Sequence, residues 1–281
     1  MTLVAMTDLA RRARHAGSPT GIGAFNVIQL EHAEAIVAGA EAANRPVIMQ
    51  VSENTAAYHR SLVPLALACL AVAEESSAEV VVHLDHATDA GLVRQAVALG
   101  VGSVMYDASA QPHASNVRST REMTVEAHAA GVWVEAELGE IGGKDGVHAP
   151  GARTRPDEAA TYVLETGVDA LAVAVGSSHA MLTRDAALDH DLIAELAAAV
   201  SVPLVLHGSS GVPDDGLRAA VELGMTKINI ATHLNALMAA AVRGALLDER
   251  LIDPRKYLGP GREVVAAEVG RLLTLLATSP Y

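Results

Sequence analysis

Three histidines occupy equivalent positions in this chain, each just after a short apolar run: His86, His179 and His207. The runs that precede them are Val80–Leu84, Ala170–Val175 and Pro203–Leu206. Each run has the length and composition of a buried parallel strand. Three neutral imidazoles at the ends of three strands are the donor set of a catalytic zinc site with an open position. Such an ion keeps its full positive charge and can act as a Lewis acid.

Carboxylates accompany these histidines. Asp85 directly follows an unbroken apolar run, so neither a surface charge nor a helix cap explains it. A buried carboxylate beside a dication stays ionised and could take a proton from a substrate hydroxyl. Asp107 and Glu137 end two other runs, where they could bind a second cation, orient the histidines or form a structural pair. His83 shares the face of Asp85, and packing is its favoured role.

Eight short strands that alternate with helices must position these side chains. The predicted strands are Ile22–Asn26, Val47–Val51, Val80–Asp85, Ser103–Tyr106, Val132–Leu138, Ala170–Val175, Pro203–His207 and Lys227–Ile230. The predicted helices between them include Glu31–Ala43, Ala90–Leu99, Asn116–Ala130, Pro156–Glu165, Asp191–Val200 and Pro213–Leu223. This pattern favours a closed (β/α)8 TIM barrel over an open doubly wound sheet. The G-x-G-x-x-G turn of a Rossmann-type sheet is also absent from the sequence.

Two segments depart from this pattern within the single domain that we expect over residues 1–281. Residues 140–155 form a long, Gly-rich, polar stretch after the fifth strand, which we interpret as an active-site lid. Residues 234–281 are expected to hold two extra helices, Leu234–Leu247 and Arg262–Ala277, joined by a linker at 253–260. Because a barrel closes without them, we expect these helices to form a subunit contact in a homodimer or homotetramer.

Composition and charge limit the partners and the location that we expect for this protein. The 281 residues carry a formal net charge of −13, which disfavours nucleic acid and anionic membranes. Cys69 is the single cysteine and lies in an apolar stretch, so we expect a buried thiol. The sequence has no apolar run of 18 residues and no signal-peptide pattern at its start, so we expect a cytoplasmic protein.

A candidate phosphate site lies between the last two strands. Residues 208–211 read Gly-Ser-Ser-Gly and join the seventh strand to a helix. Backbone N–H groups beside small residues, with a helix N-terminus behind them, bind phosphate. The segment Asn229–Thr232, after the eighth strand, completes the usual phosphate position of such barrels.

Taken together and in order, these motifs resemble the class II, zinc-dependent fructose/tagatose-bisphosphate aldolases almost from end to end. The motifs are Ala24-Phe25-Asn26, His83-Leu84-Asp85-His86, Glu135-Ala136-Glu137-Leu138-Gly139, Ala172-Val173-Ala174-Val175-Gly176, Leu206-His207-Gly208, Asn229-Ile230-Ala231-Thr232 and Asp253-Pro254-Arg255. The resemblance implies reversible aldol cleavage of a ketose 1,6-bisphosphate to dihydroxyacetone phosphate and an aldehyde phosphate.

The same resemblance implies a role for each residue. It makes His86, His179 and His207 the Zn²⁺ ligands and Asp85 the base, with Asp107 and Glu137 matching an alternative cation site. The implied substrate-binding residues are Asn26, Ser52, Ala180, Gly208, Ser210, Asn229, Thr232 and, from a neighbouring subunit, Arg255.

Three positions depart from the family pattern. Ala180 stands where a glycine usually helps to bind phosphate and a monovalent cation. The lid reads Gly-Gly-Lys-Asp where the family usually has Gly-Gly-x-Glu, with the glutamate as the acid that protonates the enediolate. Either Asp145 reaches further to take this role, or another group serves in its place. Ala231 replaces the aspartate of many fructose-type members, which leaves fructose and tagatose both open as the sugar.

Other chemistries remain open on the same barrel. A Schiff-base aldolase would need a lysine inside the barrel, and only Lys227 lies on a strand, where packing or an ion pair is the favoured role. A metal-dependent hydrolase could use Asp85 as its base, although the candidate phosphate loop and Arg255 argue against it. An aldolase for a related phosphorylated keto sugar acid and a non-catalytic sugar-phosphate binder complete the alternatives.

Overall fold

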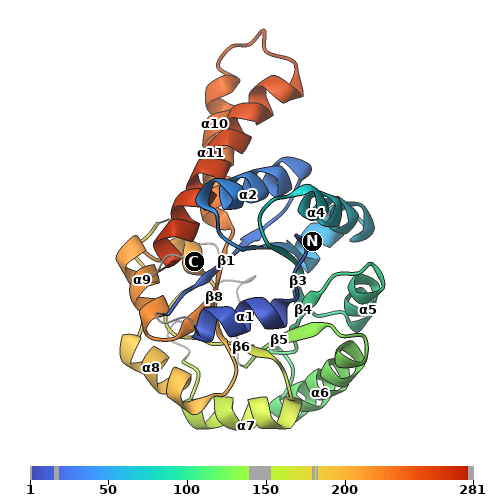
Figure 1. Cartoon of the computed structure of the whole chain (residues 1–281), viewed down its shortest axis with the longest axis vertical. Coiled ribbons are helices and arrows are strands. Elements are labelled where there is room, and N and C mark those ends of the chain that lie inside the picture. The colour runs from blue at the N-terminus through green and yellow to red at the C-terminus, as the bar shows by residue number, and fades with distance from the viewer. Residues whose placement is uncertain (1, 16–18, 139–152, 179–180, 182, 278–281) are drawn as a thin grey trace.

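Eight parallel strands close into a barrel in sequence order, with β1 paired to both β2 and β8 (Figure 1). The computed structural model describes residues 2–15, 19–138, 153–178, 181 and 183–277. The strands are β1 Ile22–Asn26, β2 Val47–Ser52, β3 Val80–Ala87, β4 Ser103–Tyr106, β5 Trp133–Glu137, β6 Ala170–Ala172, β7 Leu204–Leu206 and β8 Met225–Ile230. The predicted TIM barrel is therefore confirmed.

Helices surround the barrel, and one crosses its end. They are α1 Met6–His15, α2 Leu30–Ala43, α3 Glu53–Tyr58, α4 Val63–Glu75, α5 Ala90–Ala98, α6 His113–Ala129, α7 Pro156–Thr166, α8 His190–Ala199, the 3-10 turn η1 Ser209–Gly211, α9 Asp214–Glu222, α10 Thr232–Ala245 and α11 Pro254–Leu276. No helix in the described part of the chain combines the length and apolarity that crossing a membrane requires.

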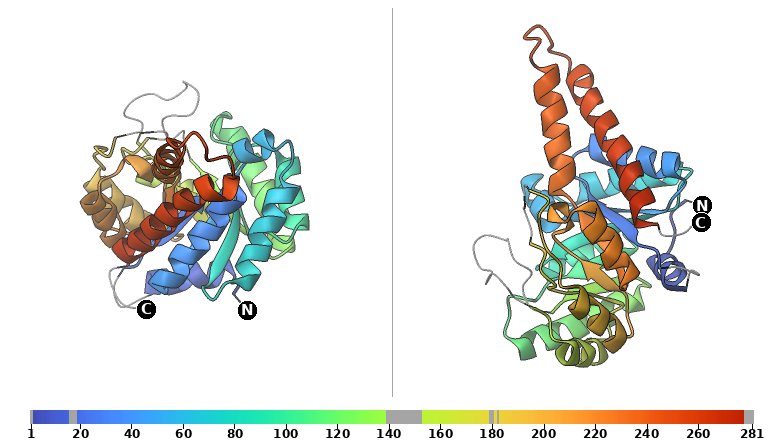
Figure 2. Two further views of the ribbon diagram at one scale, coloured as in Figure 1. Left: turned by 90° about the horizontal axis from the view of Figure 1, so that it is seen from above. Right: turned by 90° about the vertical axis from the view of Figure 1, so that its left-hand side faces the viewer.

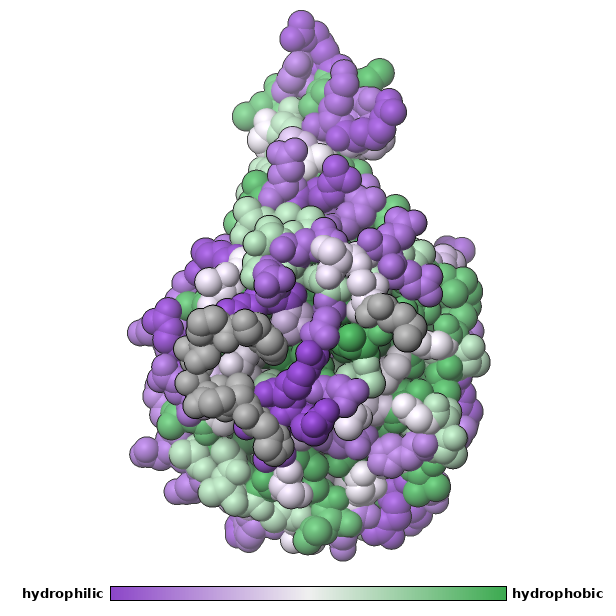
Figure 3. All heavy atoms as spheres, viewed as in Figure 1, coloured by the Kyte–Doolittle hydropathy of each residue, from purple (hydrophilic) through white to green (hydrophobic). Residues whose placement is uncertain are grey.

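The apolar core has two parts, because strand side chains alternate between the two faces of the sheet. The outer part lies between the strands and the surrounding helices and contains the predicted buried thiol of Cys69. The inner part fills the amino-terminal end of the barrel with side chains such as Ile48, Met105 and Trp133. Helix α1 closes this end by burying Leu9 against the same cluster, and its outer face is hydrophilic (Figure 3).

The opposite end of the barrel interior is polar. The buried side chains there include Gln50, Asp85, Glu137, His207 and Asn229. Because all eight strands are parallel, their carboxyl ends meet at one rim, and the chemically capable residues of different strands converge there.

The C-terminal helices form an arm that projects from the barrel. Helices α10 and α11 run side by side away from the strands, and α11 returns to pack against α2 (Figures 1 and 2). The predicted linker at 253–260 was wrong, because α11 already begins at Pro254. Proline at the first helical position loses no intrahelical hydrogen bond. The Asp253 side chain caps the helix by accepting a hydrogen bond from the Arg255 N–H, and both features favour a helix that begins at Pro254.

Helices α2 and α11 approach so closely at Gly39 that no side chain fits between them. A Cβ atom on Gly39 would lie 2.5 Å from the backbone oxygen of Ala266 and 2.8 Å from Cβ of Val269. Because Gly39 has no side chain, α11 can pack directly against the backbone of α2 at the base of the arm.

We predict that Gly39→Ala lowers the free energy of unfolding by about 1–3 kcal/mol, because the inserted methyl group overpacks this crossing. Gly244→Ala is the matched control, since Gly244 also lies in a helix but a Cβ atom there meets nothing within 4 Å. The control should be neutral or stabilising by up to about 1 kcal/mol. Urea denaturation measures both, and equal stabilities for the two variants would contradict the close crossing.

Candidate active site

Asp85 and His86 are consecutive in β3, yet both side chains face the same cluster. In a regular strand they would point to opposite faces. The pairing of β3 with β4 shifts register between Leu84 and Ala87, and His86 has a φ of +49°. Such an irregularity turns one side chain back toward the barrel interior. A non-glycine residue in this conformation costs on the order of 1 kcal/mol, as strain at functional sites often does.

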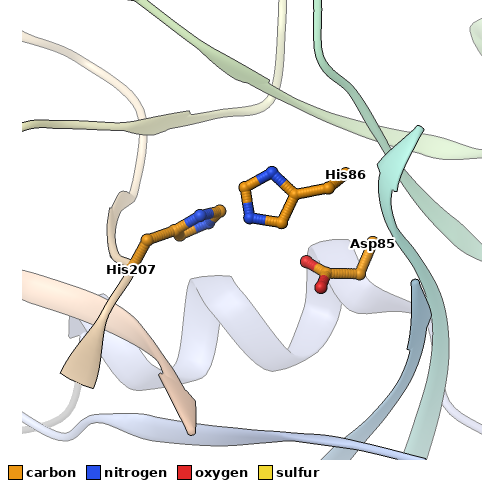
Figure 4. A group of neighbouring side chains, drawn as sticks. All are labelled: Asp85, His86 and His207. Atoms are coloured by element: carbon orange, nitrogen blue, oxygen red, sulfur yellow. The ribbon is translucent and has the colours of Figure 1, made fainter. Parts of the chain in front are cut away.

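The resulting cluster joins β3 to the end of β7. Asp85, His86 and His207 each offer one possible ligand atom, and these atoms all lie within 4.8 Å of one another (Figure 4). The rings of His86 and His207 stand edge to face, with their centroids 4.5 Å apart. The third predicted histidine, His179, lies outside the described residues.

Asp107 and Glu137 border His86, as the sequence predicted. Together with His86 they form a second group whose ligand atoms lie within 4.8 Å of one another. Asp107 Oδ2 is 3.0 Å from His86 Nδ1, and its Oδ1 accepts hydrogen bonds from the backbone N–H and hydroxyl of Ser109. An ionised Asp107 can only accept, so His86 donates to it from Nδ1, and Nε2 is then the ring nitrogen that could bind a metal ion. Asp107 and Glu137 could therefore orient His86, and together with it they could bind a second cation.

Asp85 is held by side-chain amides from two strands. Asn26 Nδ2 donates to Asp85 Oδ2 at 3.0 Å, and Asn229 Nδ2 donates to Oδ1 at 3.4 Å. Gln50 in turn donates to the Asn26 side chain at 2.8 Å. Burial opposes ionisation of Asp85, but the positive potential of His86 and Lys227 outweighs it and holds its pKa well below the usual range. The carboxylate is therefore ionised and fixed in direction.

Burial keeps the second histidine of the cluster neutral. It lowers the pKa of His207 to about 4, and the neighbouring His86 acts in the same direction. A neutral imidazole is the form that ligates a metal ion. Imidazole nitrogens beside carboxylates match the preferences of a divalent metal ion such as zinc.

Two interior residues escaped the sequence prediction, Gln50 and Glu135. Both are fully buried. The available signal was a polar residue at an inward position of an otherwise apolar strand: Glu135 lies two residues before Glu137 on the same face. Glu135 Oε2 is 2.9 Å from Lys227 Nζ, so this lysine has an ion pair, one of the two roles that the sequence favoured for it.

The predicted phosphate residues form a compact loop at β7 and β8. Gly208 has a φ of +67°, and a Cβ atom there would lie 2.6 Å from the carbonyl group of Ser178, so only glycine fits. Ser210 Oγ accepts hydrogen bonds from the backbone N–H groups of Ala231 and His233 at 3.2 Å. The loop is thereby tied to the start of α10, where Thr232 is the first residue.

Other predicted residues lie outside the cluster. Ser52 caps α3 by accepting the Thr55 N–H. Arg255 lies on the arm, with a side chain 90% exposed and paired with Asp253 at 2.9 Å. Asp145 and Ala180 fall outside the described residues, as does all of the predicted lid except residues 153–155.

Fold and site together define a (β/α)8 barrel with a metal-compatible donor set at the carboxyl ends of its strands. Residues 4–279 match the family model for class II fructose-bisphosphate aldolase. The chain is 36% identical over 305 residues to the fructose-bisphosphate aldolase of Thermus caldophilus, with 98% of both proteins covered. It is 38% identical over 276 residues to a probable fructose-bisphosphate aldolase of Bacillus subtilis strain 168, covering 96% of this chain and 95% of that protein.

Solved structures agree with these relatives. The crystal structure of the YdjI aldolase from Escherichia coli K12 superposes with a TM-score of 0.81 at 29% identity, covering 98% of this chain and 97% of that one. The chain belongs to the class II fructose-bisphosphate aldolase family. It is therefore a carbon–carbon lyase of a metal-dependent class, and the hydrolase alternative is not favoured.

His83 provides a test of the interior electrostatics. It is fully buried, and its Nδ1 lies 2.7 Å from the Ser103 hydroxyl. Burial, aided by Lys227, lowers the pKa of His83 from 6.5 to about 3. Between these values the unfolded chain binds a proton that the folded protein does not, so acidification favours unfolding.

We predict that this histidine alone removes about 2 kcal/mol of stability from the metal-free protein between pH 7.5 and pH 5. His83→Asn, whose amide can replace Nδ1 toward Ser103, should lose correspondingly less over the same range. Urea denaturation at the two pH values measures the difference. Identical pH dependence in the two proteins would show that His83 takes up its proton without unfolding.

Proposed function

We propose that the protein catalyses reversible aldol cleavage of a ketose 1,6-bisphosphate at a zinc site. The products would be dihydroxyacetone phosphate and glyceraldehyde 3-phosphate. The observation that carries this proposal is the buried cluster of Asp85, His86 and His207, in which an oriented carboxylate adjoins two potential ligands. Ala231 leaves both C4 epimers, fructose and tagatose 1,6-bisphosphate, as candidate substrates.

His86 and His207 would hold Zn²⁺ together with His179. Their fit rests on ligand atoms that already lie within 4.8 Å of one another. A bound Zn²⁺ would polarise the substrate carbonyl and stabilise the negative charge that develops when the C3–C4 bond breaks. Asp107 and Glu137 would orient His86 or bind a second divalent cation, and a monovalent cation beside Ala180 is part of the same proposal.

Asp85 would remove the proton of the C4 hydroxyl group. The amides of Asn26 and Asn229 fix both of its oxygens, so the carboxylate keeps its direction while the substrate binds. The positive charge of Lys227, together with that of a bound metal ion, would also favour the alkoxide that forms beside Asp85. Asp145, by the family resemblance, would return a proton to the three-carbon product.

The β7–β8 loop would bind the phosphate of the dihydroxyacetone phosphate half. Because the Ser210 oxygen already accepts two amide N–H groups, its hydroxyl proton can be directed at a phosphate oxygen. Gly208, Asn229 and the N-terminal end of α10 at Thr232 would supply the remaining contacts.

Ser52 and Arg255 would act at the other end of the substrate. Ser52 ends β2 at the same rim of the barrel as the cluster. Arg255 is the second residue of α11, and this helix belongs to the arm that projects from the barrel of its own chain (Figure 2). We therefore assign Arg255 to the distal phosphate of a neighbouring subunit in a homodimer or homotetramer, for which the arm would be the contact. A guanidinium can hold phosphate through two charge-assisted hydrogen bonds.

We predict that chelation abolishes cleavage and that added Zn²⁺ restores it, because the cluster supplies metal ligands and no reactive amine. Borohydride with substrate should not inactivate the enzyme, since Lys227 is buried in an ion pair with Glu135. Fructose and tagatose 1,6-bisphosphate, assayed side by side, identify the sugar. Full activity in the metal-free protein, or a reduced covalent adduct on Lys227, would overturn the proposal.

We predict that subunits carrying Asp85→Ala and Arg255→Ala complement one another. Alone, the first should lower kcat by about 100- to 10,000-fold, as loss of a general base does. The second should raise KM by roughly 10- to 100-fold, as loss of a charged hydrogen bond does. At a two-fold interface the hybrid has one doubly defective site and one intact site, so its activity should recover to about half of wild type.

Differently tagged chains allow the hybrid to be purified and its composition verified before assay. Arg250→Ala is the matched control, because Arg250 is also exposed on the arm and paired with a nearby aspartate. This variant should keep the wild-type KM. If a verified hybrid shows no recovered activity, Arg255 does not act in the active site of the neighbouring subunit.

A further inference from the structure

A charged pair lies in the barrel interior beneath the cluster of Asp85, His86 and His207. Glu135 of β5 and Lys227 of β8 have side chains that are 0% and 1% exposed, with Lys227 Nζ 2.9 Å from Glu135 Oε2. Interiors of such barrels are usually filled by branched apolar side chains. Buried ion pairs are weak contributors to stability, because desolvation offsets the attraction. Stability alone therefore does not explain this pair, and its other contacts indicate a different role.

The carboxylate of Glu135 bridges the lysine and a proposed metal ligand. Its Oε2 faces Lys227, and its Oε1 lies 2.9 Å from His207 Nε2. The ammonium group of Lys227, 2.9 Å from Oε2, is the counter-charge that an ionised carboxylate needs in the barrel interior. An ionised carboxylate can only accept a hydrogen bond. His207 must then carry its proton on Nε2.

The opposite ring nitrogen of His207 is directed at the cluster. His207 Nδ1 lies 3.8 Å from Glu137 Oε2, a member of the group around His86. With the proton on Nε2, Nδ1 presents a lone pair to this space. Metal-ligating histidines commonly donate their second ring N–H to a carboxylate, which fixes both the tautomer and the ring orientation.

We propose that Glu135 is a positioning residue that holds His207 as its Nε2–H tautomer with Nδ1 toward the metal, and that Lys227 is its counter-charge. This inference rests on the proposed role of His207 as a metal ligand. It gives Lys227, the one lysine on a strand in the described part of the chain, a role that requires no imine chemistry. It also explains why the charges occur as a pair, since an unpaired carboxylate at this depth would be strongly destabilising.

The neighbouring side chains support this arrangement. His83 Nε2 lies 3.9 Å from Glu135 Oε2, and its Nδ1 is held by the Ser103 hydroxyl at 2.7 Å. The carboxylate of Glu135 therefore lies among Lys227 of β8, His83 of β3 and His207, which directly follows β7. These contacts restrict the rotation of the Glu135 carboxylate and, through its hydrogen bond, that of the His207 ring.

Two double variants separate the hydrogen bond to His207 from the buried charge. Glu135→Gln with Lys227→Met removes both charges but keeps an oxygen that can accept the Nε2–H. Glu135→Leu with Lys227→Met removes both charges and the acceptor. Neither variant buries an unpaired charge, so both should fold, and circular dichroism and thermal unfolding verify that they do.

Zinc affinity, measured by competition with a chromophoric chelator, is the first readout. The Leu-containing double variant should bind Zn²⁺ about 10- to 100-fold more weakly than wild type, the usual effect of losing such a support. The Gln-containing double variant should recover most of that loss. Equal affinities for two correctly folded double variants would overturn the positioning role.

The tautomer itself is the second readout and needs no metal. Long-range ¹H–¹⁵N spectra of the metal-free protein, assigned with a His207→Asn variant, should show His207 protonated on Nε2 in wild type and in the Gln variant. The Leu variant should show a tautomer mixture. Protonation of wild-type His207 on Nδ1 would overturn this inference. Absence of aldol cleavage in zinc-loaded wild type would instead contradict the proposed function.

Discussion

Charge buried at the carboxyl ends of the strands has to be compensated, and the structure around the site follows from that constraint. Asp85 accepts hydrogen bonds from two side-chain amides, and Glu135 contacts a lysine and a histidine. Asp107 accepts from Ser109 on one oxygen and faces His86 with the other. Each compensating contact also fixes a direction. The pairing that makes burial tolerable is therefore the same pairing that aims the imidazoles and the carboxylate at one point.

Closure of the barrel allows this arrangement. The amino-terminal end of the interior is apolar and covered by α1, so charge is confined to the opposite rim, where parallel strands end together. The irregularity of β3 then brings two consecutive residues, Asp85 and His86, to the same side. The proposed base and a proposed metal ligand thus lie next to each other in sequence and in space, at the cost of a strained backbone at His86.

The sequence predicted the barrel and the cluster because each apolar run marks a strand, and the residue that follows it marks the rim. His86, His207, Asp107 and Glu137 were located in this way. Two features of the site were harder to predict from the sequence. Alternation predicts that Asp85 and His86 point apart, and only the bulge explains why they do not. Glu135 lies within a strand, and its importance depends on contacts from β7 and β8 that are distant in sequence.

The account depends most directly on where the metal binds. Crystals of the zinc-loaded enzyme, measured at the zinc absorption edge, give an anomalous peak that locates the ion without reference to activity. We expect the principal peak at bonding distance, about 2.0–2.1 Å, from Nε2 of His86 and Nδ1 of His207. The contacts of Asp107 and Glu135 with the opposite ring nitrogens should persist. A principal peak bonded to neither imidazole, or bonded to His207 through Nε2, would contradict the account.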